Sequence, residues 1–143
     1  MQALLGIQHK PTPGQSVGVR VMLLSNSPEG QAAQWLVDYG SLVETRGDVG
    51  HALSGIVNDP IGYDLFVMQC DGLGGVDAAE AAIAALVAAE ARLRVILISR
   101  EFGEPDYPFG RRTAVCLPTA VAEEGFRRGF DHVLRDRAPV TLM

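Results

Sequence analysis

Three polar residues that could take part in chemistry follow an apolar run near the middle of the chain. Residues 63–77 read YDLFVMQCDGLGGVD, so Gln69, Cys70 and Asp71 stand between the apolar run and a glycine-rich turn. The unbroken run from Leu65 to Met68 is typical of a strand that is covered on both faces of a parallel sheet. Open α/β sheets place their sites at the carboxyl ends of such strands. A catalytic or binding site is therefore expected where this strand ends.

The composition favours one globular domain. The chain has 143 residues, of which 48% are hydrophobic and 20% charged, enough to build a core. A net charge of −5 argues against direct nucleic-acid binding, since such domains carry a basic face. No apolar run reaches the roughly 18 residues of a membrane span, and no leader peptide opens the chain. These features predict a cytoplasmic protein without membrane contact.

Strand-like and helix-like segments alternate along the chain. Strands are expected at 19–24, 41–45, 65–69, 94–99 and 113–117, and helices at 27–39, 48–57, 77–91 and 120–134. Ser27, Asp48 and Thr119 are the expected N-caps of the first, second and last helix. The segment 101–110 holds two prolines and two glycines, so a helix between the fourth and fifth strands should be short or absent.

This alternation predicts an α/β fold. Repeated strand–helix units form a parallel sheet with helices on both faces, joined by right-handed crossovers. A flavodoxin-like three-layer sandwich with five strands in the order 2-1-3-4-5 fits the length and the number of strands. The expected organisation is an N-terminal extension at 1–18, one domain at 19–136 and a C-terminal tail at 137–143.

Some patterns argue against particular functions. Cys70 and Cys116 lie near the ends of the third and fifth expected strands, and another strand lies between these two in the expected order. Buried structural thiols are therefore favoured over a redox pair. The histidines lack the spacing of metal ligands. The glycines at 72–75 do not form a nucleotide-binding fingerprint. No catalytic residue and no metal site is therefore assigned from these patterns.

Segments 19–29, 63–77, 95–99 and 115–118 resemble the receiver domain of bacterial two-component response regulators, the CheY-like version of this fold. The resemblance covers about residues 18–136. In that family the first strand ends in an acidic pair that holds Mg²⁺, and the third ends in the phosphorylated aspartate. The fourth strand ends in serine or threonine, and the fifth in lysine followed by proline. The resemblance implies a role in two-component signal transduction and phosphorelay.

This sequence departs from the family at most of these positions. The acidic pair falls on Ser25 and Asn26, the phosphoacceptor on Gln69 and the lysine on Leu117, whereas Ser99 keeps the hydroxyl. Magnesium prefers carboxylate oxygens, and phosphoryl transfer needs positive charge beside the reacting group. An amide is also a poor nucleophile. The resemblance therefore predicts a pseudo-receiver that is not an enzyme, with weak or absent Mg²⁺ binding and no other cofactor.

Asp71, two residues past the acceptor position, leaves a second interpretation open. It could accept a phosphoryl group if the strand ended differently. The simpler interpretation is a turn aspartate that binds local backbone amides.

Three functions follow as hypotheses. The first is a protein–protein interaction module that binds a histidine kinase, an effector or a second copy of itself, through the region from the fourth strand to the last helix. Contact residues are expected in the loop after the fourth strand: Phe102, Tyr107, Phe109, Arg111 and Arg112. The second is a receiver that is phosphorylated on Asp71. The third is a small-ligand sensor, whose pocket is formed by the polar residues at the degenerate site.

Overall fold

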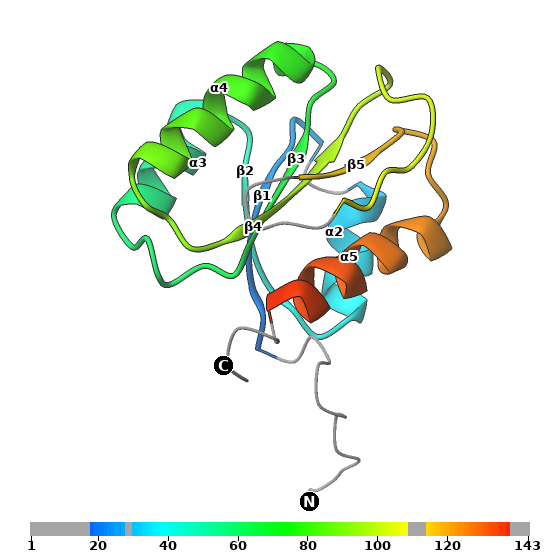
Figure 1. Cartoon of the computed structure of the whole chain (residues 1–143), viewed down its shortest axis with the longest axis horizontal. Helices are drawn as coiled ribbons and strands as arrows, with labels where there is room; N and C mark the ends of the chain where they lie inside the picture. The colour runs from blue at the N-terminus through cyan, green and yellow to red at the C-terminus, as the bar shows by residue number, and fades with distance from the viewer. Residues whose placement is uncertain (1–17, 28–29, 109–113, 138–143) are drawn as a thin grey trace, which may run out of the picture.

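The computed structural model describes residues 18–27, 30–108 and 114–137, and it contains one five-stranded sheet (Figure 1). All neighbouring strands are parallel, in the order β2-β1-β3-β4-β5. The predicted flavodoxin-like topology is thereby confirmed. The strands are β1 (Arg20–Leu24), β2 (Leu42–Arg46), β3 (Leu65–Gln69), β4 (Arg94–Ile98) and β5 (Val115–Leu117).

Four helices cover the two faces of the sheet. Helices α3 and α4 lie on one face, and α2 and α5 lie on the other, which gives three layers (Figure 1). Their bounds are α2 (Gln31–Asp38), α3 (Val49–Val57), α4 (Gly75–Ala88) and α5 (Glu123–Arg137). None of the described helices is long and apolar enough to cross a membrane.

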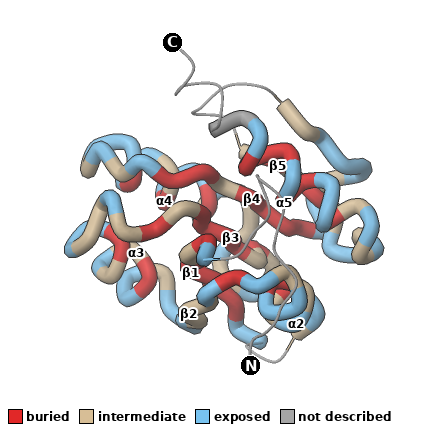
Figure 2. The backbone as a smooth tube through the Cα atoms, turned by 90° about the horizontal axis from the view of Figure 1, so that it is seen from below, coloured by how far each residue is buried: buried red, intermediate tan, exposed pale blue. Residues whose placement is uncertain are grey.

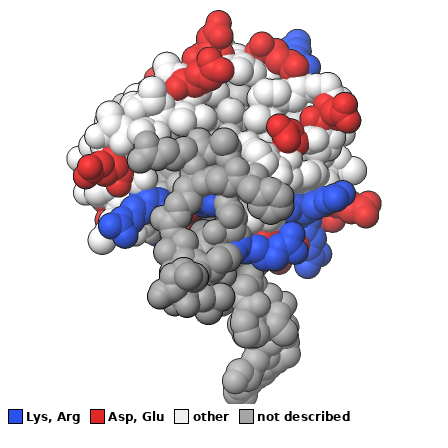
Figure 3. Space-filling view, in the orientation of Figure 1, with Lys and Arg blue, Asp and Glu red and all other residues white. Residues whose placement is uncertain are grey.

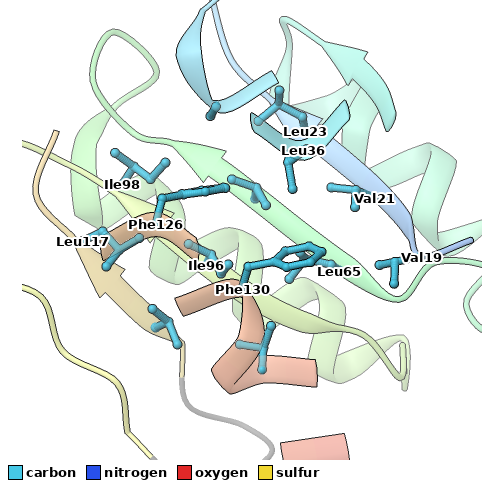
Figure 4. Close-up of a cluster of buried hydrophobic side chains, with 14 of the residues drawn as sticks. Val19, Val21, Leu23, Leu36, Leu65, Ile96, Ile98, Leu117, Phe126 and Phe130 are labelled. Carbon is cyan, nitrogen blue, oxygen red and sulfur yellow. The ribbon is translucent and has the colours of Figure 1, made fainter. Parts of the chain in front are cut away.

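The core consists of two apolar clusters separated by the sheet. Strand β3 is fully buried from Leu65 to Met68, because helices cover both of its faces (Figure 2). Alternate residues of each strand enter opposite clusters, as the period of two requires. The cluster under α2 and α5 is built around Leu23, Leu36, Leu65, Ile96, Leu117, Phe126 and Phe130 (Figure 4). The cluster under α3 and α4 is built around Met22, Ile56, Phe66, Met68, Leu86 and Leu97.

Two of the three predicted N-caps are wrong. Asp48 caps α3 as expected, since its carboxylate accepts a hydrogen bond from the backbone amide of His51 (2.9 Å). Helix α2, however, has Gly30 as its N-cap, and the carbonyl of Ser27 instead closes a turn with the Gly30 amide (3.0 Å). Helix α5 begins at Glu123, four residues after Thr119. The hydroxyl of Thr119 is used elsewhere, as described below.

No helix occurs in the described part of the connection between β4 and β5, which agrees with the prediction for this segment. Asp106 instead pairs antiparallel with Cys116 on the outer side of β5. The amide of each residue donates a hydrogen bond to the carbonyl of the other, at 2.8 and 3.0 Å. The connection therefore covers part of the exposed edge of the sheet. The N-terminal extension and the C-terminal tail that the sequence predicts lie almost wholly outside the described residues.

Candidate functional site

The carboxyl edge of the sheet brings together the residues that the sequence assigns to a degenerate phosphorylation site. Ser25 and Asn26 follow β1, Gln69 ends β3, Ser99 follows β4 and Leu117 ends β5. The strand register places Leu24 beside Met68, Gln69 beside Ile98, and Ile98 beside Leu117. The ends of these four strands are therefore neighbours at one edge.

Ser25 and Gln69 are in direct contact. The buried hydroxyl of Ser25 donates a hydrogen bond to the side-chain oxygen of Gln69, and it accepts one from the backbone amide of Ser27 (2.9 Å). The residues that the resemblance to receiver domains assigns to one metal position and to the acceptor position are thus bonded to each other. Both groups are neutral, so neither supplies the negative charge with which a protein holds Mg²⁺.

The side chain of Asn26 lies over Gly72, in the turn that follows β3. Gly72 has a φ of +81°, a left-handed conformation that residues with a side chain rarely adopt. A methyl group added at Gly72 would also overlap the side-chain amide nitrogen of Asn26. The turn is therefore specific for glycine because of its left-handed conformation, whereas the end of the Asn26 side chain can move aside.

Replacing Gly72 by alanine is expected to destabilise the domain by about 1–2 kcal/mol, because alanine in the left-handed region is strained. Gly103 is the matched control, since its φ is not positive and a methyl group there meets nothing within 4 Å. Urea denaturation of both variants measures the difference in free energy of unfolding. Equal stability of the two variants would contradict the left-handed conformation of Gly72.

Ser99 closes a local turn after β4. Its buried hydroxyl accepts a hydrogen bond from the backbone amide of Glu101 (3.0 Å). The carboxylate of Glu101 in turn accepts a hydrogen bond from the amide of Val76 (2.9 Å), in the first turn of α4. A carboxylate at this end of a helix is favoured by the helix dipole. Ser99 and Glu101 therefore fasten the loop after β4 to the start of α4.

Asp71 links the ends of three strands. Its Oδ2 accepts a hydrogen bond from the hydroxyl of Thr119, which follows β5. Its Oδ1 accepts one from the backbone amide of Arg100 (3.1 Å), which follows β4, and the Arg100 Nε lies 3.5 Å from the same oxygen. These partners are 29 and 48 residues away in the sequence, so the expectation that Asp71 binds local amides is wrong.

The hydrogen bonds of Asp71 stabilise its charged form. Burial raises the pKa of the Asp71 carboxyl, but the hydrogen bonds from Thr119 and Arg100 and the positive charge of Arg100 outweigh this effect. The net result is a pKa below the ordinary value for aspartate. Asp71 is therefore a carboxylate at neutral pH.

Leu117 and the two cysteines offer no reactive group at this edge. Leu117 is fully buried in the cluster under α2 and α5, on the face opposite the cysteines. Burial, followed by the nearby charge of Asp71, raises the pKa of the Cys70 thiol to about 11. Burial and the charge of Asp106 also raise the pKa of Cys116. Both cysteines are free and protonated at neutral pH, and thiols are poor nucleophiles in that form.

The two described aromatic residues of the expected partner surface contribute to the chain's own packing. Phe102 is half-buried against the cluster under α3 and α4. The Tyr107 hydroxyl donates a hydrogen bond to the Gly125 carbonyl (3.1 Å), and the guanidinium of Arg128 lies 5.1 Å from the centre of the Tyr107 ring. Phe109, Arg111 and Arg112 lie outside the described residues.

A shallow hollow lies between the loop after β4 and α5. Its volume is about 650 Å³, and both acidic and basic side chains line it. The lining residues include Pro105, Tyr107, Arg127, Arg128, Asp131 and Arg135. This surface belongs to the region from β4 to α5, in which the sequence predicts a partner site.

Sequence reasoning missed a charged cluster at the opposite edge of the sheet. The guanidinium of Arg20 lies 4.2 Å from the centre of the Tyr63 ring and forms ion pairs with Glu44 (3.2 Å) and Asp59 (3.0 Å). The Tyr63 hydroxyl donates a hydrogen bond to Glu44 (2.7 Å), and this bond is the main cause of the lowered pKa of the Glu44 carboxyl. The cluster joins β1, β2 and the segment before β3, so its evident role is structural.

The candidate site thus contains polar groups that bond mainly to one another. In the part of the chain that the structure describes, no three His, Cys, Asp or Glu residues are grouped so that they could hold a metal ion. The sequence matches no protein-family model and no curated protein. The resemblance to receiver domains therefore depends on the residues quoted above, together with the sheet topology.

Proposed function

We propose that this protein is a receiver-like signalling domain that acts without phosphoryl transfer. It works as a protein–protein interaction or dimerisation module in two-component signal transduction, and its partner is a histidine kinase, an effector or a second copy of the chain. The observation that carries this proposal is the hydrogen bond between Ser25 and Gln69. This hydrogen bond joins two neutral side chains, one at a metal position and one at the acceptor position of the receiver pattern.

The chemistry of the edge supports this proposal. Phosphoryl transfer to a protein side chain needs a nucleophile, a metal ion and positive charge near the transferred group. Here an amide stands at the acceptor position, a hydroxyl and an amide stand at the metal positions, and buried Leu117 stands at the lysine position. Restoring the usual group at one of these four positions would still leave the groups at the other three missing.

The proposal predicts that acetyl phosphate with Mg²⁺ leaves the intact mass of the protein unchanged. The Gln69→Asp variant should also remain unmodified, because it restores the nucleophile without the metal ligands or the lysine. A receiver domain that accepts phosphate from acetyl phosphate, treated in parallel, serves as the positive control. A stoichiometric gain of one phosphoryl group by the native chain would disprove the proposal.

Phosphorylation of Asp71 is the second candidate, because Asp71 is a partly exposed carboxylate at the same edge and Arg100 lies beside it. Both of its oxygens already accept hydrogen bonds, so a phosphoryl group would compete with Thr119 or Arg100 for this carboxylate. If acetyl phosphate does add mass, Asp71→Asn distinguishes the candidates. Loss of the modification in this variant would identify Asp71 as the acceptor.

The interaction itself is proposed to involve the region from β4 to α5. Arginine is common at interaction hot spots, and Arg127, Arg128 and Arg135 line the hollow beside α5 together with Asp131. Alternating charges of this kind allow a second copy to pair with the same surface in a two-fold dimer. The molar mass in solution, measured by light scattering without phosphate, tests self-association.

A further inference from the structure

One face of the sheet is incompletely covered at β4 and β5. On the face under α2 and α5, Ile96, Val115 and Leu117 are fully buried. On the opposite face, Leu97 is also buried, but Val95, Ala114 and Cys116 remain partly exposed. The same face is fully covered at β1 and β3, where Met22, Leu24, Phe66 and Met68 are fully buried. Leu42 of β2, on the same face at the other edge of the sheet, is also 60% exposed. The exposure at β4 and β5 differs in that the connection between these strands carries no helix in its described part.

The uncovered area lies where a further helix would pack on this face of the sheet. Strands are about 4.8 Å apart and packed helices about 10 Å apart, so one helix spans about two strands. Helix α4 connects β3 to β4 and packs on residues of both strands. The next helix position on this face therefore lies over β5. Each of the preceding strand connections contains a helix, whereas the described part of this one does not.

One side of α4 borders this area with apolar residues. Ile83 and Val87 are one turn apart and share a side of the helix. In a right-handed crossover from β3 to β4, that side faces β4 and β5, and the alanine-rich side faces α3. Ile83 is partly buried, and Val87 is 40% exposed although it is a large apolar residue. We call Ile83, Val87, Val95, Ala114 and Cys116 the apolar strip.

Acidic residues flank the strip. Glu80 lies about one turn before Ile83 on the same side of α4, and it is exposed. Asp106 is exposed and pairs with Cys116, and Glu101 and Glu104 lie in the same loop. Figure 3 shows most acidic side chains over the upper part of the visible face and most basic ones over the lower part. A positively charged occupant is therefore favoured at this end of the strip.

We propose that the apolar strip binds an amphipathic, basic helix of a partner protein, which lies beside α4 and over β5, where the described part of the chain places no helix. A helix fits better than an added strand, because Asp106 already occupies the backbone amide and carbonyl of Cys116 at the outer edge. The inference rests on the proposed function, since it gives that interaction module its partner class.

Cys116 provides a natural reporter of this binding. It lies in the strip and is partly exposed, whereas Cys70 is fully buried. A thiol reagent applied to the native, full-length chain should therefore modify Cys116 first, as peptide mapping would show. The probe is a stapled helical peptide of 14 residues, the length of α4, with leucine on one face and lysine on the other. The control peptide carries glutamate in place of lysine.

The lysine peptide is expected to protect Cys116 at about tenfold lower concentration than the glutamate peptide, through the flanking carboxylates. The Glu80→Lys variant should lose most of this preference. Glu124→Lys is the matched control, because Glu124 is exposed on α5, on the other face of the sheet, and it should keep the preference. Equal protection by both peptides, or no protection by either, would overturn the proposal.

Two other occupants give different results, and either would overturn the proposal. If residues 1–7 of the same chain cover the strip, the full-length Leu4→Glu, Leu5→Glu variant should expose Cys116 to the reagent without any peptide. If a second copy covers it, Cys116 should become protected as the protein concentration rises. The acetyl phosphate experiment is independent of both, so phosphorylation would disprove the proposed function while protection by the lysine peptide still supported the helix site.

Discussion

Replacing Phe126 by alanine is expected to lower the free energy of unfolding by about 3–5 kcal/mol. Phe126 is fully buried between α5 and the sheet, and its ring centre lies 5.3 Å from that of Trp35 and 6.2 Å from that of Tyr39. Truncation removes these two ring contacts and leaves a cavity in the cluster that Figure 4 shows. Since domains are typically stable by about 5–15 kcal/mol, this single change would remove a large share.

Urea denaturation followed by circular dichroism measures this loss. Val37→Ala is the matched control, because Val37 belongs to α2 but is 56% exposed. Surface substitutions of this kind usually change stability by less than about 0.5 kcal/mol. A similar loss in both variants would contradict the position of α5 on the sheet.

Replacing Asp71 by alanine is expected to destabilise the domain by about 2–3 kcal/mol, the second largest effect. The side chain is only 24% exposed, and it accepts charge-assisted hydrogen bonds from Thr119 and from the amide of Arg100. Alanine leaves these donors without their partner and releases the link between the ends of β3, β4 and β5. Urea denaturation at neutral pH measures the loss.

The pH dependence of stability provides a separate test of Asp71. Its pKa is lowered in the folded protein, so its ionisation stabilises the fold above the unfolded value of about 3.9. This contribution is lost as the pH falls through the folded pKa. The native chain and the Asp71→Asn variant should therefore differ less in free energy of unfolding as the pH falls below about 4.

Thr119→Val identifies the donor in the same experiment. It removes the hydroxyl that holds Oδ2 of Asp71 and keeps a β-branched side chain, so the acid transition should move to higher pH. In the Asp71→Asn background, the same change should have a smaller effect, because the two residues act as a pair. Additive effects of the two substitutions would contradict the hydrogen bond between Thr119 and Asp71.

The effect of Asp71 also bears on the proposed function. In the proposed module, Asp71 fastens the loops after β4 and β5, and these loops lie next to the region expected to bind partners. The loop after β4 is held a second time by Glu101 at the start of α4. Contacts within the chain thus fasten both loops.

The sequence by itself determined the topology of this protein and the chemical character of its candidate site. Apolar runs such as Leu65 to Met68 predict covered parallel strands, because burial on both faces requires an uninterrupted apolar sequence. The order of strands and helices then limits the sheet to few arrangements. The neutral residues Ser25, Asn26 and Gln69 were also evident, since residue type alone decides whether a carboxylate is present.

Only the tertiary structure decided which residues these groups contact. Thr119 reads as an N-cap in the sequence, yet its hydroxyl binds Asp71, 48 residues away. The partial exposure of Cys116 beside fully buried Leu117 was equally hidden, because both stand in one short apolar strand. Local patterns report propensity and period, whereas such contacts depend on how strand ends and loops meet at the edges of the folded sheet.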